Sequence, residues 1–105
     1  MSKAQREELK RALQAQSDDL RSVASTPQGR RLLYLVCEHA GILDRAFSPD
    51  PYVTAHMAGR RDVGLWLLGW LQTSARPLYD KMLSEASTAA EEKAREAEKL
   101  VASEE

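Results

Sequence analysis

Two cap–proline pairs, Thr26-Pro27 and Asp50-Pro51, constrain the fold of this chain more than any other feature. A Thr or Asp side chain before a helix can accept a backbone N–H, and proline suits the first helical position because its missing N–H costs nothing there. Each pair therefore predicts the start of a helix. Gly41, followed by an apolar residue, predicts a left-handed residue that ends the first of these two helices.

Residues of high helix propensity dominate the chain and β-branched residues are few, so no strand is expected. We predict an all-α protein of about four helices, forming a small helical bundle with extended terminal helices. The expected helices cover residues 3–23, 27–40, 51–72 and 75–102. They divide the chain into an N-terminal helix (1–25), a helical core module (26–73) and a charged, Ala-rich C-terminal helix (74–105). Thr73 or Ser74 is expected to cap the last helix.

The chain has 105 residues, which is enough for one domain with a modest core. It contains one Phe, and its two Trp residues lie within five positions of each other. A core built from these residues has to be local, or a partner has to complete it.

The charge is unevenly distributed, although the net charge is only −1 and creates no overall field that favours nucleic acid or membranes. Residues 21–61 carry six Arg against three acidic residues, a balance of +3. Residues 78–105 carry eight acidic against four basic residues, a balance of −4. The chain is therefore predicted to be an Arg-bearing body with an acidic tail.

Location is predicted from what the sequence does not contain. There is no apolar signal segment at the N-terminus and no 18-residue apolar run, so no membrane association is expected. A single Cys allows no disulfide within the chain and suits a reducing compartment. We expect a protein that is made and assembled in the cytosol.

Both terminal helices are predicted to have narrow apolar faces. In the first, Leu9, Leu13, Leu20 and Val23 form a stripe that Gln16 interrupts, which suits a coiled-coil-like or peripheral helix. In the last, the face beyond Leu83 consists mostly of Ala. Such a helix frays when isolated, so we expect another chain or a neighbouring copy to hold it, with Leu100 and Val101 as terminal anchors.

A nearly continuous apolar block ends the helix expected over residues 51–72. Its members Val63, Trp66, Leu67, Trp70 and Leu71 can share one face. A helix that is apolar most of the way round is either central or held between subunits. We therefore treat Trp66 and Trp70 as candidate partner-binding residues. The three glycines of this helix, Gly59, Gly64 and Gly69, are expected to allow close helix approach.

Catalytic and metal-binding patterns are weak. Cys37, His39 and His56 are the candidate soft metal ligands, but they lack the spacing of a structural zinc site, and Cys37 is expected in the core. Ser48, Asp50 and His56 resemble a triad only in composition, and Ser48 and Asp50 are better explained as turn and cap residues. We expect no enzyme activity, no cofactor and no bound metal.

Two pairs of basic side chains are the best candidates for contact chemistry: Arg30, Arg31, Arg60 and Arg61. The planar guanidinium group binds phosphates and carboxylates in a two-pronged manner. The alternative is that these residues form ion pairs within the chain, with Glu38, Asp44, Asp62 or the acidic tail. Both interpretations remain open from the sequence.

Residues 26–71 resemble a small family of tailed-phage proteins first named from a Bordetella podovirus. The resemblance rests on an ordered set of short motifs: Thr26-Pro27-x-Gly29-Arg30, Cys37-x-x-Ala40-Gly41, Phe47-x-Pro49-Asp50-Pro51, Thr54-Ala55 and Gly59-Arg60-Arg61-x-Val63-Gly64-Leu65. The chain departs from the family pattern at His56-Met57-Ala58, where relatives often have an aromatic residue, Asn and an acid. The genes of the family lie among head and tail morphogenesis genes, which implies a role in the virion or its assembly and supplies no catalytic residue.

The expected function is therefore that of a structural or assembly component of a tailed-phage particle, in the portal, neck or internal core. Its expected partners are other virion proteins or copies of itself, with no membrane. Its expected location is the virion, and the host cytoplasm during assembly. The alternative is a small phage protein that binds nucleic acid or modulates the host through its Arg pairs. A small enzyme or metal protein is a third, weaker class.

Overall fold

The computed structural model describes residues 1–43 and 49–104 and confirms the all-α prediction, with four helices and no strand in that part of the chain. The helices are α1 (Lys3–Ala24), α2 (Pro27–His39), α3 (Pro51–Ser74) and α4 (Arg76–Glu104). Their bounds differ from the predicted ones by at most two residues. The predicted connector over residues 42–47 lies mostly outside the described residues, as do Asp44 and Ser48.

Local side-chain chemistry sets the helix ends. The Thr26 hydroxyl accepts the backbone N–H of Gly29 at 3.0 Å, and the Asp50 carboxylate accepts that of Tyr52 at 2.9 Å, so both predicted N-caps are confirmed. Gly41 has the predicted left-handed backbone, with a φ of 76°. The chain then reverses, and the N–H of Ile42 donates to the carbonyl of Cys37 at 3.4 Å.

A capping box that the sequence analysis did not single out starts α1. The backbone N–H of Gln5 donates to the Ser2 hydroxyl at 3.2 Å, and the Gln5 side chain accepts the N–H of Ser2 at 2.8 Å. These reciprocal bonds satisfy two donors that the first turn would otherwise leave free. The exposed N-terminal end of α1 is thus stabilised locally, without tertiary contacts.

The predicted cap of the last helix is wrong. Thr73 and Ser74 both belong to α3, and α4 follows after the single residue Ala75. The Thr73 hydroxyl donates back to the carbonyls of Gly69 and Trp70, at 3.2 and 3.1 Å, instead of turning toward the next helix. The Ser74 hydroxyl instead lies 3.1 Å from that of Ser17 in α1. The Ser74 side chain, which the sequence pattern assigned to a helix cap, thus makes a tertiary contact with α1.

The four helices meet in one hub, where each contacts the other three. The centre of the hub is formed by Leu20 and Ala24 of α1, Leu71 of α3 and Met82 of α4. Partly buried side chains surround them: Leu33, Tyr34, Leu67, Leu68, Trp70, Leu78 and Tyr79. The core is therefore small and drawn from distant parts of the sequence.

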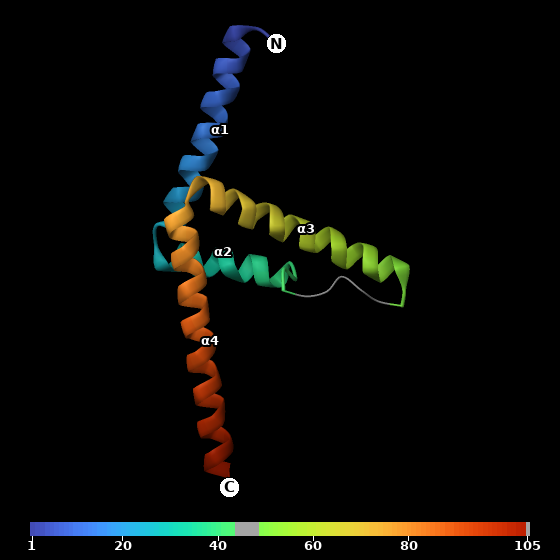
Figure 1. Cartoon of the computed structure of the whole chain (residues 1–105), viewed down its shortest axis with the longest axis vertical. Helices are drawn as coiled ribbons and strands as arrows, with labels where there is room; N and C mark the ends of the chain where they lie inside the picture. Colours follow the sequence, from blue (N-terminus) through green and yellow to red (C-terminus); the bar gives the residue numbers. More distant parts are fainter. Residues whose placement is uncertain (44–48, 105) are drawn as a thin grey trace.

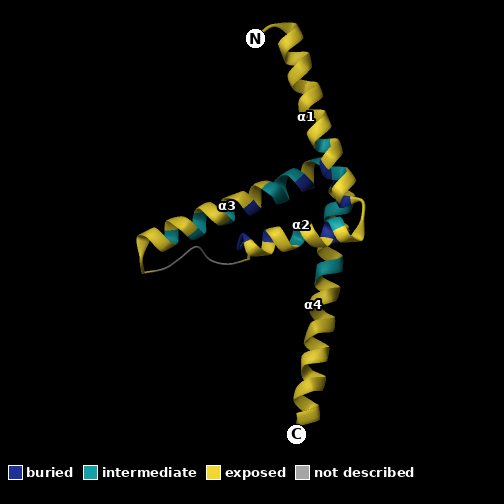
Figure 2. Cartoon of the chain, turned by 180° about the vertical axis from the view of Figure 1, so that it is seen from behind, coloured by how far each residue is buried: buried dark blue, intermediate teal, exposed yellow. Residues whose placement is uncertain are grey.

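The molecule is extended and flat. From the hub, α1 and α4 run in opposite directions, and the antiparallel pair α2 and α3 projects to one side, giving the outline of a T (Figure 1). The principal extents are 72 × 39 × 15 Å and the radius of gyration is 18.7 Å. A compact domain of this length has a radius of gyration of about 13 Å. Buried residues gather near the hub and along the facing sides of α2 and α3, while the outer lengths of α1 and α4 are exposed (Figure 2).

Close approach of α2 and α3 depends on one glycine of the three predicted. A Cβ on Gly64 would lie 2.7 Å from the Ala40 Cβ and 2.7 Å from the Ile42 Cγ2, so Gly64 allows the two helices to pack. The same prediction is wrong for Gly59 and Gly69, where an added Cβ meets nothing within 4 Å. These two glycines face open space because α2 is shorter than α3 and covers one side of it.

Candidate protein-interaction surfaces

An ion pair closes the corner between α2 and α4. Arg30, in the first turn of α2, is only 3% exposed, and its Nε lies 2.5 Å from Glu85 Oε1. Its Nη2 donates to Glu85 Oε2 at 3.4 Å, and its Nη1 donates to the Ala24 carbonyl at the end of α1 at 3.0 Å. One guanidinium group thus links three helices. A buried Arg is tolerated here because each side of its fork has an acceptor.

The Arg30 contact also changes the acidity of its partner. The hydrogen bond from Arg30 holds the pKa of Glu85 below its usual value, and the positive charges of Arg30, Lys81 and Arg31 act in the same direction. Glu85 is therefore held in its ionised form by the hub. Of the two interpretations of the Arg residues, intramolecular pairing with the acidic C-terminal segment is the one that the structure gives for Arg30.

Gly29 explains why the corner between α1 and α2 is so tight. A Cβ on this residue would lie 1.7 Å from the Val23 carbonyl oxygen, which is backbone and cannot swing away. The Thr26, Gly29 and Arg30 motif therefore has a structural role. Thr26 caps α2, Gly29 admits the end of α1, and Arg30 ties both helices to α4. Sequence analysis found the cap but not the reason for the glycine, and no local signal pointed to Glu85, 55 residues away.

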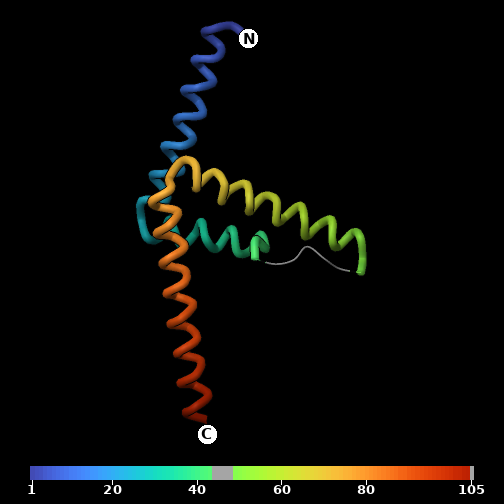
Figure 3. Tube along the Cα trace, viewed as in Figure 1, coloured from blue at the N-terminus to red at the C-terminus, as the bar shows by residue number. Residues whose placement is uncertain are grey.

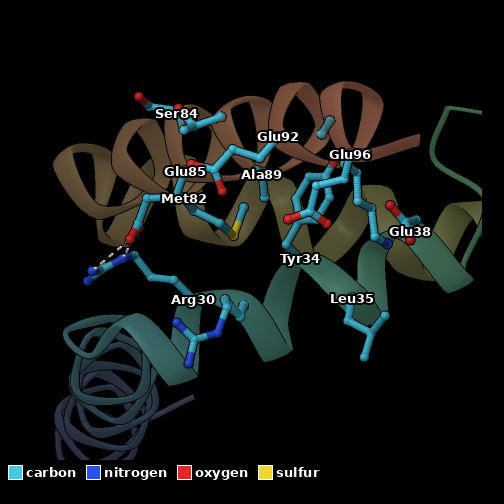
Figure 4. Close-up of a pocket in the computed structure, with 15 residues that line it drawn as sticks. Arg30, Tyr34, Leu35, Glu38, Met82, Ser84, Glu85, Ala89, Glu92 and Glu96 are labelled. Atoms are coloured by element: carbon cyan, nitrogen blue, oxygen red, sulfur yellow. Dashed lines mark hydrogen bonds and ion pairs between the residues drawn. The ribbon is translucent and has the colours of Figure 1, made fainter. Parts of the chain in front are cut away.

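A groove of about 820 Å³ opens between α2 and α4 (Figure 4). Arg30 and Glu85 lie at one end of it, and Tyr34 and Glu96 face each other from opposite walls further along. The lining is mixed in charge and includes small side chains of α4 such as Ala89. The groove is open and could hold a peptide segment or a helix edge, and it contains no arrangement of side chains that indicates a particular reaction.

The other Arg residues are not brought together with Arg30. Arg31 is exposed and lines the groove. Arg60 is exposed on α3, and the neighbouring Arg61 is half-buried, with an Nε that is buried and has no hydrogen-bond partner among the described residues. The two pairs lie near opposite ends of α2, because Arg30 and Arg31 are in its first turns and Gly64, near Arg60 and Arg61 on α3, faces its C-terminal end.

The Trp block is split between the core and the surface. Leu71 is 1% exposed and belongs to the centre of the hub, and Trp70 packs against it in part. Trp66 is 64% exposed and stacks on Trp70, with ring centroids 5.4 Å apart. Val63, one turn before Trp66, is also exposed. The outer side of α3 thus presents an aromatic and aliphatic patch that this chain does not cover.

The terminal helices carry further uncovered apolar side chains. Leu9 and Leu13 of α1 are 47% and 54% exposed, and Leu100 and Val101 of α4 are 66% and 60% exposed. All residues of 3–16 and of 87–104 are exposed. We call these two segments the N-arm and the C-arm. The predicted anchors Leu100 and Val101 therefore contact no other helix of the described chain.

The weaker candidates are scattered. Cys37 is fully buried, as predicted; its thiol lies 4.0 Å from the Gly64 carbonyl, and burial raises its pKa. His39 and His56 are exposed. No three His, Cys, Asp or Glu side chains of the described residues are arranged to hold a metal ion. Asp50 acts as the predicted N-cap, whereas Ser48, the first member of the supposed triad, is outside the described part of the chain.

Comparison with known proteins places these features in a family. The family model for Bbp19-like phage proteins matches residues 20–84. The chain belongs to this family. The resemblance inferred from the ordered motifs is therefore confirmed, and the chain is a bacteriophage protein. Searches of curated proteins and of solved structures found no significant match.

The Bbp19-like match covers the hub and the hairpin and stops close to where the arms begin. It starts at Leu20, the first buried residue of α1, and ends one residue before Glu85. The whole N-arm and the whole C-arm lie outside it. Within the described residues, none of the helices contains a stretch both long and apolar enough to span a membrane.

Proposed function

We propose that this Bbp19-like protein is a structural or assembly component of a tailed-phage particle, in the portal, neck or internal core, and that it acts by packing its helices against other proteins rather than by catalysis. Other virion proteins or further copies of the chain are its partners. The observation that carries the proposal is the flat, extended shape, with apolar side chains exposed on helices that project from a small hub.

The extended shape supports this function because it leaves apolar side chains exposed that a free monomer does not bury. Long helices that leave the core make few tertiary contacts, and isolated helices gain little stability in water. Exposed apolar patches on otherwise polar surfaces typically mark sites of protein contact. The N-arm, the C-arm and α3, which carries the exposed Val63 and Trp66, extend from the hub in different directions (Figure 1), so one chain can join more than one neighbour.

Nucleic-acid binding through the Arg pairs is the competing function. The geometry favours it less, since Arg30 is buried against Glu85 and the two pairs lie near opposite ends of α2. A groove that binds the phosphate backbone needs several cations along one track. The negative C-terminal segment beside Arg31 works against such a track.

Quantitative mass spectrometry of purified virions tests the proposal. We expect the protein at a fixed copy number that matches a symmetric ring or core, and we expect particles from phage lacking the gene to be incomplete or unstable. A protein abundant in infected cells and absent from both mature virions and assembly intermediates would contradict the proposal. Filter binding across a salt series addresses the rival, because DNA affinity that falls steeply with salt would support it.

A further inference from the structure

The N-arm carries an apolar stripe that continues from the core, but no other helix of the described chain covers the stripe on the arm. Leu20 is buried in the hub, and Leu13 and Leu9 lie on the same side of α1, two and three turns earlier. Spacings of three and four residues along this face, through Gln16, are those of a coiled-coil seam. The same side of α1 is thus buried inside the hub and exposed beyond it.

A complementary stripe of small residues, with larger ones at its ends, begins on α4 just before the C-arm and continues along it. Leu83, Ala86, Ala90, Ala94, Ala97 and Val101 share one side of α4. Residues that line the groove, such as Glu92 and Glu96, lie on other sides of the helix. The stripe borders the groove at Ala86 and Ala90, and from residue 87 onward the residues on it are exposed.

Charged residues flank the two stripes in matching positions. On the N-arm, Lys10 directly follows Leu9, and Lys3 lies seven residues earlier on the same flank. On the C-arm, Glu91 directly follows Ala90 and Glu98 directly follows Ala97, again seven residues apart. All four side chains are exposed, and none takes part in a salt bridge among the described residues.

We propose that two copies of this chain form a reciprocal dimer, in which the N-arm of each copy packs antiparallel on the C-arm of the other. In an antiparallel helix pair the same flanks of the two helices face each other, whereas in a parallel pair opposite flanks do. One antiparallel register then sets Lys3 against Glu98 and Lys10 against Glu91. The same register seats Leu13 over Ala90 and Leu9 over Ala94 of the second copy, large side chains against small ones.

The arrangement of the arms in space allows one symmetry operation to form both contacts. The chain runs toward the hub along α1 and away from it along α4, on opposite sides of the hub (Figure 3). Rotating a second copy by 180° about an axis that passes beside the hub, across the long dimension, sets the two hubs side by side and brings each N-arm beside the other copy's C-arm, in antiparallel orientation. The contact is therefore closed and does not propagate into a filament. The arms match in length, about 21 Å for residues 3–16 and about 27 Å for residues 87–104.

Pairing of like arms is disfavoured by the same side chains. Two C-arms would place Glu91 and Glu98 against each other and Ala against Ala, and two N-arms would place Lys against Lys. Like charges on facing flanks select against such pairs. The inference rests on the proposed function in that contact between chains is the mode of action, but it names the second copy as the occupant of both arms.

Cysteine cross-linking tests the register directly. In the chain carrying Leu13→Cys and Ala90→Cys, mild oxidation should give a disulfide-linked dimer. The two positions lie on opposite arms of one chain, so the bond can form only between chains. The control carries Leu13→Cys and Thr88→Cys, with the second cysteine on another side of α4, and should cross-link much less. Equal cross-linking of the two variants would overturn the register.

Charge exchange tests the pairing without a covalent bond. Lys3→Glu with Lys10→Glu, or Glu91→Lys with Glu98→Lys, should raise the dimer dissociation constant at least about tenfold, because four ion pairs per dimer become like-charge contacts. All four changes together should restore it. Arg11→Glu with Glu92→Lys, one position along and away from the stripes, should leave it unchanged.

Sedimentation of the purified full-length protein gives the readout. A monomer at all accessible concentrations, or a dimer that the four changes do not restore, would overturn the proposed pairing. Neither outcome bears on whether the protein occurs in virions, so failure of the dimer and failure of the proposed function can be told apart.

Discussion

At the scale of single residues, close packing between helices depends on two glycines that have different neighbours. Gly29 faces a backbone carbonyl of α1, and Gly64 faces the ends of two side chains beyond α2. The backbone carbonyl at Gly29 cannot give way without moving a helix. At Gly64 the Ile42 methyl group can turn aside, and the Ala40 Cβ, which is fixed to the backbone, belongs to the residue that follows α2. The two positions should therefore differ in their tolerance of a methyl group.

Alanine substitution measures this difference. Gly29→Ala should lower the free energy of unfolding by about 3 kcal/mol, and Gly64→Ala by about 1–2 kcal/mol, because both overpack the interior. Gly59→Ala is the matched control within α3. Its added Cβ meets nothing, so it should raise stability by about 0.5–1 kcal/mol through helix propensity. Chemical denaturation followed by circular dichroism checks all three, and a neutral Gly29→Ala would show that α1 and α2 separate readily.

The Arg30–Glu85 contact predicts a pH dependence whose sign follows from the lowered pKa. Because folding lowers the pKa of Glu85 from its ordinary value of about 4.5, ionised Glu85 contributes stability above that pH. The contribution is lost as the pH falls through the lower pKa of the folded protein. Glu85→Gln should therefore reduce the melting temperature near neutral pH, and the difference from the natural chain should shrink below about pH 4.5.

Glu92→Gln is the control for this measurement, since Glu92 lies on the same helix and makes no ion pair among the described residues. It should shift the melting temperature little at any pH. The melting temperatures of Glu85→Gln and the natural chain could instead differ by the same amount down to strongly acidic pH. That result would show that the Arg30 contact does not control the charge of Glu85.

At the scale of the helices, the sequence predicted what local chemistry determines. Thr26, Asp50 and Gly41 set helix ends with atoms a few positions away, so their roles were readable without the fold. Ser74 was misassigned because its hydroxyl bonds to Ser17, 57 residues away. The sequence left the partner of Arg30 undecided for the same reason, because Glu85 lies 55 residues away. Spacing along α3 grouped Trp66 with Leu71, but the positions of α1 and α4 decide that Leu71 is the one that is covered.

Trp66 and Leu71 therefore separate surface from core on one helix. Leu71→Ala should lower the free energy of unfolding by about 3 kcal/mol, because it empties space at the centre of the hub. Trp66→Ala should change it by less than about 1 kcal/mol, since the ring is mostly exposed and loses mainly its contact with Trp70. If the outer side of α3 binds a virion partner, Trp66→Ala should also lower incorporation into particles at unchanged helix content. Equal losses of stability would place Trp66 in the monomer core.

At the scale of the whole molecule, order should decrease with distance from the hub. All six helix pairings occur among the described residues, whereas every residue of the two arms is exposed and only the first turns of the C-arm border α2, across the groove. Helices held only by their own hydrogen bonds open readily, even where a capping box supports one end. The molecule then combines a cooperative centre with two arms whose order depends on contact with something else.

Hydrogen exchange on the full chain measures this gradient. In dilute solution, amides around Leu20, Leu71 and Met82 should be strongly protected, and those of residues 5–14 and 89–103 should exchange fast. Raising the protein concentration should slow exchange in both arms together, at one midpoint, because the proposed dimer orders an N-arm and a C-arm in the same contact. The Lys3→Glu, Lys10→Glu variant should keep fast exchange in both arms at concentrations where the natural chain is protected. Arms already protected at high dilution would mean that they fold back on their own hub, and the extended shape would then not be the form of the free chain.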